Sequence, residues 1–202
     1  MQPDDSTTRR RILKSALKHF AHSGYAASSV QQIVGDARVS KPALYYHFSD
    51  KAGLFQALLD SVHDEQFRRI QEAAARAGNI RDQLLEILTE IFDYLHQNRE
   101  LVRMSFATAF AARGELPDKL KYREKCERNF NFVHGLIKTA LANGELDRRF
   151  DSLELALGFY GQLNIYVMGH LWMPRNRLDR KLAGRVVELL FAGAAAKKKG
   201  SK

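Results

Sequence analysis

Apolar residues recur every three or four positions along almost the whole chain, and this spacing constrains the fold more than any other feature. Such a period places apolar side chains on one face of an α-helix. No segment alternates apolar and polar residues between hairpin turns, as a half-buried strand would. Only four prolines and thirteen glycines interrupt the 202 residues. The sequence therefore predicts an all-α fold of about nine helices.

Capping residues and helix breakers set the expected bounds of these helices. A first helix over residues 8–22 should end near Gly24, because glycine readily adopts the left-handed conformation that closes a helix. Ser28 and Ser29 each precede a glutamine by three residues, so either serine could cap a second helix that buries Val30, Ile33, Val34 and Ala37. Longer helices are predicted over residues 50–77, 80–97, 99–113, 117–142, 152–172 and 178–195.

One predicted helix, which follows Ser40, is too short to be stable by itself. The Ser40 hydroxyl can accept from an unpaired amide of the first turn. Pro42 occupies a position where a helix does not need the missing N–H. The helix should end near Phe48, so neighbouring helices must hold it while one face stays exposed. Two short helices joined by a tight turn, the second with a free face, indicate a helix-turn-helix motif, whose second helix lies in a DNA major groove.

Positive charge is concentrated at the two ends of the chain. Residues 1–51 hold eight Lys/Arg and four Asp/Glu, and residues 197–202 add four lysines to a total formal charge of +9. The intervening residues are close to neutral, so the N-terminal end is the part expected to bind a polyanion. The lysine-rich residues 197–202 are predicted to be a disordered basic tail.

Little in the sequence suggests another compartment or class of protein. The single Cys126 excludes an intramolecular disulfide framework. The chain contains no signal-peptide pattern and no apolar span of about 18–20 residues, so a soluble, cytoplasmic protein with no membrane partner is expected.

The rival class is an all-α enzyme, and the sequence offers little chemistry for one. His19 and His22 share a helix face, but a third metal ligand is not evident nearby. His63-Asp64-Glu65 lacks the second histidine of a zinc-protease helix. A phosphate-binding glycine loop and the usual Ser or Cys nucleophile contexts are also missing. We therefore expect no catalytic residues, no metal site and no cofactor.

A family resemblance is carried by three segments of the N-terminal quarter. They are Ser29-x-x-x-Ile33, the run Ala37-x-Val39-Ser40-Lys41-Pro42-Ala43-Leu44-Tyr45-Tyr46-His47-Phe48, and Lys51-x-x-Leu54. With these segments, residues 10–58 resemble the DNA-binding domain of the TetR family of bacterial transcriptional regulators. Arg38 departs from the glycine frequent at its position, so a positive φ there would cost roughly 1 kcal/mol or more.

The resemblance and the side-chain chemistry together imply a set of DNA-binding residues. Phosphate contacts position such a domain, whereas base contacts select the sequence. The expected phosphate-contacting residues are Ser29, Tyr46, His47 and Lys51. Arg38 could also reach a phosphate, and the cap Ser40 is counted among the DNA-binding residues. The expected base-reading residues are Gln31, Lys41, Pro42, Ala43 and Tyr45, which follow or precede the cap Ser40. Leu44 and Phe48 should instead point into the core by helical spacing.

Three of these residues also have an ordinary structural interpretation. His47 could be a half-buried packing residue, Lys51 an ordinary surface lysine, and Gln31 a solvated glutamine. If the assigned roles hold, Lys41 can donate to guanine O6 and N7, and Gln31 can pair with adenine.

The later helices are similar in outline to the ligand-binding and dimerisation domain of the same family. The resemblance places ten residues on helices that surround the effector cavity: Phe92, His96, Met104, Phe106, Phe110, Phe132, Phe159, Gln162, Tyr166 and His170. Effector pockets are mostly apolar with a few orienting polar groups, so an apolar or aromatic small molecule is expected. The alternatives are that these residues are ordinary core and that the regulator has no effector.

The domain prediction is residues 1–55 for DNA binding, residues 56–196 for effector binding and dimerisation, and residues 197–202 for the tail. The helix over 152–172 is apolar nearly all round and must be covered on several sides. Pairing it and the last helix with a second copy would form a four-helix bundle. The predicted protein is a homodimeric repressor on a palindromic operator in double-stranded DNA, released when an effector binds.

Overall fold

The structure is a computed structural model that describes residues 5–112, 114–117, 120–173 and 177–194. Within these ranges all regular secondary structure is helical, which confirms the predicted all-α class. The helices are α1 (Asp5–Ala27), α2 (Val30–Ala37), α3 (Lys41–His47), α4 (Lys51–Ala75), α5 (Ile80–Gln97), α6 (Arg99–Ala109), α7 (Tyr122–Ala142), α8 (Ser152–Trp172) and α9 (Arg180–Ala194). The predicted tail, residues 197–202, lies outside the described residues.

The chain divides into two compact units. Unit 1 comprises Met1–Asp64 and Asn98–Cys126, and unit 2 comprises Glu65–Gln97 and Glu127–Lys202. Helices α4 and α7 therefore each begin in unit 1 and end in unit 2. Residues 98–126 group with the N-terminal helices, whereas the sequence prediction placed them in the second domain. The functional boundary between residues 55 and 56 stays a prediction.

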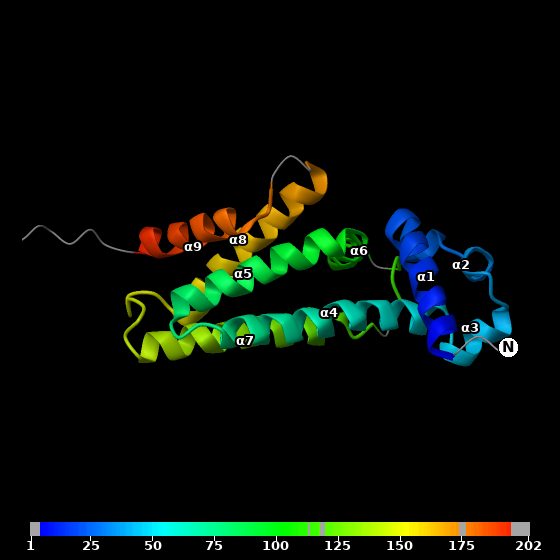
Figure 1. Cartoon of the computed structure of the whole chain (residues 1–202), viewed down its shortest axis with the longest axis horizontal. Coiled ribbons are helices and arrows are strands. Elements are labelled where there is room, and N and C mark those ends of the chain that lie inside the picture. Colours follow the sequence, from blue (N-terminus) through cyan, green and yellow to red (C-terminus); the bar gives the residue numbers. More distant parts are fainter. Residues whose placement is uncertain (1–4, 113, 118–119, 174–176, 195–202) are drawn as a thin grey trace, which may run out of the picture. The chain divides into compact units, whose positions relative to one another are not determined.

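Unit 1 is built around α1, against which α2, α3 and α6 pack (Figure 1). Its buried core takes apolar residues from each of these helices and from the first half of α4. The central members are Ile12, Phe20, Ile33, Leu44, Leu54, Phe55 and Met104. These are the residues that helical spacing selects, and full burial of one such side chain contributes about 1.5–3 kcal/mol.

Helical geometry breaks at Gly24, as predicted, where φ is 77° and ψ is 174°. A short turn follows the break, so α1 reaches Ala27 rather than residue 22. Glycine adopts this positive φ without the steric cost that a Cβ would impose. The break turns the chain toward the start of α2.

The segment between α6 and α7 is less helical than predicted. Helix α6 ends at Ala109 instead of residue 113, and α7 begins at Tyr122 instead of residue 117. A turn replaces the predicted helix, since the Ala112 amide donates to Glu115 Oε2 at 2.9 Å and Gly114 has a φ of 87°. Further along, the Lys121 amide donates to Gln56 Oε1 at 2.9 Å. Side-chain hydrogen bonds therefore satisfy backbone groups that the periodicity assigned to a helix.

In unit 2, α5 packs along α9, and α8 also contacts α9. Helix α8 begins with a capping box, as the sequence predicted. The Asp151 carboxylate accepts from the Leu153 amide at 2.8 Å, and Glu154 Oε2 accepts from the Asp151 amide at 3.2 Å. Residues Leu155, Phe159, Leu163, Val167 and His170 form its buried side. Its other side remains exposed over several turns.

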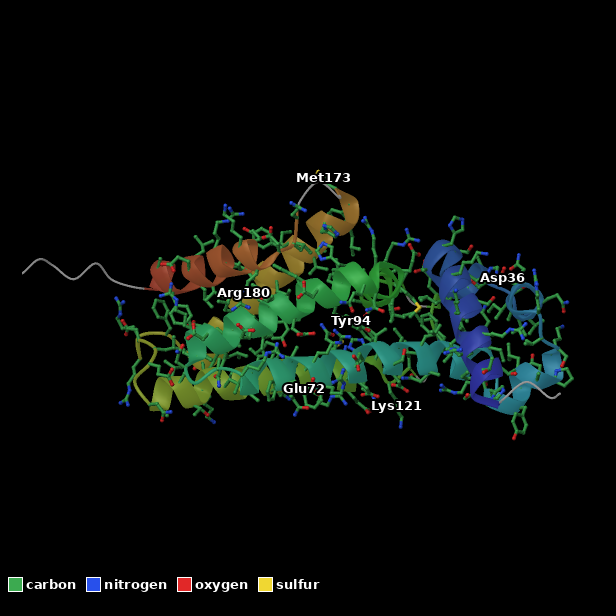
Figure 2. The ribbon with its side chains drawn as sticks, in the orientation of Figure 1. Asp36, Glu72, Tyr94, Lys121, Met173 and Arg180 are labelled. Carbon is green, nitrogen blue, oxygen red and sulfur yellow. The ribbon has the colours of Figure 1, made fainter. Side chains whose placement is uncertain are left out.

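Ion pairs connect α4, α5 and α9 across the surface of unit 2. Glu65 accepts from Arg68 at 2.7 Å and from Arg69 at 2.6 Å, and Arg69 also donates to Glu90 at 2.9 Å. Arg68 also pairs with Glu72, and Arg180 of α9 pairs with Glu86 (Glu72 and Arg180 are labelled in Figure 2). Hydrogen bonds from Arg68 and Arg69 lower the pKa of Glu65 to about 2.

Glu65→Gln is expected to reduce the acid sensitivity of unit 2. Because the folded-state pKa of Glu65 is depressed, its stabilisation is present above about pH 4.5 and is lost as pH falls toward about 2. The side chain is 35% exposed, so solvent screening limits the loss at pH 7 to about 1 kcal/mol. Thermal unfolding of the original protein and of Glu65→Gln should show a difference in melting temperature that shrinks between pH 7 and pH 3. Glu72→Gln, at a more exposed position on the same helix, is the control, and a pH-independent difference would contradict the assignment.

Candidate DNA-binding surface

Helix α3 is fixed at both ends by hydrogen bonds that its sequence specifies. The Ser40 hydroxyl accepts from the Ala43 amide at 3.2 Å, and Pro42 lies in the first turn. At the other end the Phe48 amide donates to the Leu44 carbonyl at 2.9 Å. These hydrogen bonds at its two ends stabilise a helix of seven residues, which is too short to be stable by itself.

The two faces of α3 differ as predicted. Leu44 is fully buried and Phe48 is 6% exposed, which confirms that they anchor the helix to the core of unit 1. Lys41 and Pro42 are exposed, while Tyr45 and Tyr46 are 48% and 78% exposed. Exposed tyrosine rings beside a lysine form a surface that can contact bases and phosphates. Ala43 and His47 are half-buried at its edges.

Ser29, rather than Ser28, caps α2. The Ser29 hydroxyl accepts from the Gln32 amide at 3.1 Å, and the Ser29 amide donates to Gln32 Oε1 at 3.2 Å. Ser28 is buried and donates to the Gly24 carbonyl at 2.7 Å. The Ser29 hydroxyl keeps its hydrogen for donation to a phosphate. Gln31 is exposed on α2, as base reading would require.

Arg38 closes α2 in the left-handed conformation, with φ 53° and ψ 50°. Its amide donates to the Gly35 carbonyl at 3.1 Å, and the next amide, that of Val39, donates to Val34 at 3.0 Å. Arg11 of α1 supports this turn, since its Nη2 donates to the carbonyls of Ala37 at 2.6 Å and of Arg38 at 3.0 Å. Arg11 has no sequence signal, because it lies 26 residues from Ala37.

Arg38→Gly is expected to raise the free energy of unfolding by about 0.5–1 kcal/mol, because a left-handed L-residue is strained. The same change should weaken DNA binding and lower its salt dependence by about one phosphate contact. Urea denaturation and binding at several salt concentrations measure the two effects. Arg38→Ala is the matched control, since it removes the charge but keeps the strained φ. A destabilised Arg38→Gly protein would contradict the strain argument.

Lys51 is already engaged within unit 1. Its Nζ lies 4.4 Å from the centre of the Tyr25 ring and donates to the Ala26 carbonyl at 3.3 Å. Burial lowers the pKa of Lys51. These contacts hold the lysine at the end of α1, beside the cap of α2. A phosphate contact from Lys51 stays a prediction, and it would have to share the ammonium group with Ala26.

A polar network fixes α2 to α1. Ser15 donates to the Ile33 carbonyl at 2.9 Å and to Asp36 at 3.2 Å, while Lys18 pairs with Asp36 at 3.1 Å. The Lys18 hydrogen bond is the main cause of a lowered pKa at Asp36. The Asp36 carboxylate is therefore paired within the protein.

The structure divides the predicted effector residues between the two units. Met104, Phe106 and Phe110 belong to unit 1, and Phe110 is 73% exposed. Unit 2 holds the other seven, among which the rings of His96 and His170 lie 5.3 Å apart. The unit 2 residues are Phe92, His96, Phe132, Phe159, Gln162, Tyr166 and His170.

Gln162 is the most informative of the predicted effector residues. Its Oε1 atom is fully buried, and none of the described residues donates a hydrogen bond to it. Gln162, Tyr166 and His170 follow each other at four-residue intervals, so they share one face of α8. A buried acceptor of this kind carries a desolvation cost that a ligand donor would relieve.

The part of the chain that the structure describes offers neither a metal site nor a membrane-spanning helix. There, the acidic, cysteine and histidine side chains form no group of three that could hold a metal ion. No helix in those ranges is long and apolar enough to cross a membrane.

Two short helices joined by a tight turn, the second anchored by one buried face and exposing lysine and tyrosine side chains on the other, are typical of the helix-turn-helix class. Residues 12–58 match the family model described as bacterial regulatory proteins, tetR family. Residues 12–58 of the chain therefore carry the DNA-binding domain of the TetR family of bacterial regulatory proteins. The matching relatives are transcriptional regulators and not enzymes, as the sequence led us to expect.

Individual relatives are distant. The chain is 29% identical to the uncharacterised transcriptional regulator YuxN of Bacillus subtilis, over 58% of this chain and 37% of YuxN. It is 28% identical to the transcriptional regulator TtgR of Pseudomonas putida, over 65% of this chain and 79% of TtgR. The chain thus spans well under half the length of YuxN.

The fold is also found in a solved structure, that of the regulator FadR from Bacillus subtilis in complex with stearoyl-CoA. The two chains superpose with a TM-score of 0.74 at 21% identity, over 91% of this chain and 98% of FadR. This likeness concerns the fold alone.

Proposed function

We propose that the protein is a DNA-binding transcriptional repressor that acts as a homodimer on a palindromic operator. The observation that carries the proposal is α3, whose Leu44 and Phe48 are buried while Lys41, Pro42, Tyr45 and Tyr46 face outward. Two such helices, one from each copy, would enter successive major grooves about 34–36 Å apart. Because its partner is DNA, we expect the protein in the cytoplasm.

A small-molecule effector forms the second part of the proposal. It is supported by the buried acceptor of Gln162 and by the neighbouring His96 and His170 rings in unit 2. The fold relative FadR was solved with stearoyl-CoA, an apolar chain on a polar carrier. An effector that releases DNA must bind the released state more tightly than the DNA-bound state.

Selection of bound sequences from random double-stranded DNA tests the first part. We expect enrichment of a roughly palindromic sequence with half-sites about one helical turn apart. Enrichment of a single, non-repeated half-site would argue against a dimer, and no enrichment would argue against specific DNA binding.

Thermal-shift screening with apolar and aromatic compounds tests the second part. A compound that binds the folded state raises the melting temperature by mass action. We expect Gln162→Leu to weaken the binding of such a compound, because the substitution removes the hydrogen-bond acceptor and keeps the side-chain volume. The alternative is a regulator without an effector, and it predicts no compound whose effect depends on Gln162.

A further inference from the structure

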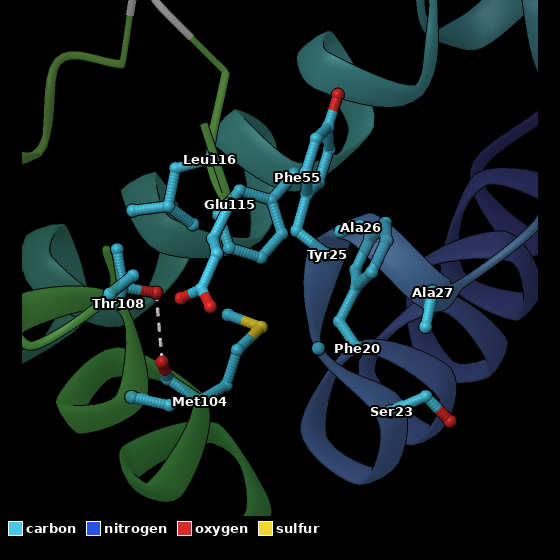
Figure 3. Close-up of a pocket in the computed structure, with 13 residues that line it drawn as sticks. Phe20, Ser23, Tyr25, Ala26, Ala27, Phe55, Met104, Thr108, Glu115 and Leu116 are labelled. Atoms are coloured by element: carbon cyan, nitrogen blue, oxygen red, sulfur yellow. Dashed lines mark hydrogen bonds between the residues drawn. The ribbon is translucent and has the colours of Figure 1, made fainter. Parts of the chain in front are cut away.

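Unit 1 contains a cavity that none of the predicted DNA contacts uses. Its volume is about 310 Å³, and it lies between the end of α1, the start of α4 and the end of α6 (Figure 3). Glu115 and Leu116, from the turn after α6, form another wall. Ligand pockets typically enclose about 300–1,000 Å³, so this cavity suits a compact molecule.

Aromatic rings form the apolar side of the cavity. The ring centres of Phe20 and Phe55 lie 5.0 Å apart, and those of Tyr25 and Phe55 lie 5.1 Å apart. Met104 and Leu116 add flexible apolar surface opposite them. Aromatic faces carry negative charge density, so they attract cations as well as apolar groups.

The charged side chain in the lining of the cavity, that of Glu115, is negative. Figure 3 shows the Glu115 carboxylate directed toward Met104, while its Oε2 accepts from the Ala112 amide at 2.9 Å. Two helices, α1 and α6, have their C-terminal ends at this cavity. A helix C-terminus carries roughly half an elementary negative charge, so both ends favour a bound cation.

Two cations of the chain already use the end of α1 in this way. Lys51 lies over the Tyr25 ring and donates to the Ala26 carbonyl. Arg103 donates to the Ala21 carbonyl at 3.0 Å. Rings and carbonyls at this end of α1 thus bind an ammonium and a guanidinium within the protein itself.

We propose that this cavity binds a compact organic cation. Its ammonium group would pair with Glu115, and its apolar body would pack on the Phe20, Tyr25 and Phe55 rings. The occupant would contact Tyr25, Ala26 and Ala27, which lead from the break at Gly24 to the cap of α2. The site differs from the predicted effector residues of unit 2. Of the ten predicted effector residues, Met104 of unit 1 alone lines it.

Three probes with the same phenylpropyl body and different charges test the ligand class: 3-phenylpropylamine, 3-phenylpropan-1-ol and 3-phenylpropionate. Titration calorimetry of the purified full chain at neutral pH, without DNA, measures their binding. We expect the amine to bind about tenfold more tightly than the alcohol, and the propionate to bind most weakly. Equal binding of all three, or no binding of the amine at millimolar concentration, would overturn the proposal.

Two variants test the location. Glu115→Gln should reduce the affinity of the amine to that of the alcohol, whereas Glu124→Gln, which removes an exposed acid of α7, should leave it unchanged. Ala107→Phe should fill the cavity and weaken the binding of both the amine and the alcohol. Circular dichroism melts establish that each variant is folded. Amine binding that survives either Glu115→Gln or Ala107→Phe would place the ligand elsewhere and overturn the assignment. Because the assay contains no DNA, its outcome is separate from that of the proposed repressor function.

Discussion

Replacing Leu157 and Ile165 together by glutamate is expected to make the protein monomeric and to lower its operator affinity at least about 100-fold. Both residues lie on α8 and are large apolar side chains facing outward, 56% and 63% exposed. With Leu153, which is 45% exposed, and the exposed Gly161, they recur at four-residue intervals. Such a series forms one continuous ridge along a helix, the surface that packs into the groove of a second helix.

The ridge is well suited to a second copy of the same chain. Gly161 has open space around its Cα, so a partner helix can approach closely at that point. On α9, Leu189 is 60% exposed and can extend the same apolar surface. Apolar patches of this kind on a folded protein commonly mark an interface. Four glutamates across a two-fold interface would be buried without counter-charges, which a dimer cannot tolerate.

The loss of DNA affinity follows from the loss of the second half-site. Binding of one helix-turn-helix domain brings its partner to the neighbouring half-site at high effective concentration, and this linkage contributes about 10²–10⁴ in affinity. Light scattering gives the oligomeric state, and a gel-shift titration gives the operator affinity. Asn131→Glu with Thr139→Glu is the matched control, because it adds the same charges at the same spacing on the exposed side of α7. A dimer that persists in the Leu157/Ile165 variant would exclude this face.

The DNA-binding domain could be predicted closely because its determinants are local. The Ser40 cap, the Pro42 position and the burial of Leu44 and Phe48 all follow from spacings of a few residues. The capping boxes at Ser29 and Asp151 are local in the same sense. Even the choice between Ser28 and Ser29 needed the structure only because both serines precede a glutamine by three residues.

What escaped prediction depends on contacts between distant residues. Arg11 of α1 caps the end of α2, and Lys51 lies over the Tyr25 ring. No periodic pattern in the sequence indicates either contact. The predicted helices already stop at residue 113 and resume at residue 117. The apolar spacing does not register the earlier end at Ala109, after which the Ala112 amide donates to Glu115 Oε2. For the same reason the ten effector candidates read as one group in the sequence, whereas the fold divides them between two units.

Lys41→Ala is expected to change which operator the protein prefers, by about 1–3 kcal/mol at one base pair. Lys41 is the first residue of α3 and is exposed, while Leu44, three residues later, is fully buried. If α3 enters the major groove as proposed, its exposed residues Lys41, Pro42 and Tyr45 are placed to face the bases. A lysine there donates to guanine O6 or N7, and an alanine leaves those acceptors unsatisfied. Loss of the contact should remove the preference for guanine at that position and leave the rest of the operator unchanged.

Parallel selections from random DNA with the original protein and Lys41→Ala would measure this change, followed by competition with operators differing at the affected base pair. Lys14→Ala is the control, because it removes an equal charge from the exposed side of α1 in the same unit. Loss of a lysine that contacts only phosphate weakens binding to all sequences and lowers the salt dependence of binding. Lys14→Ala should therefore leave the preference among operators unchanged. If Lys41→Ala also weakened all operators equally, the lysine would be a phosphate contact. Sequence selection by α3 would then rest on Pro42, Ala43 and Tyr45.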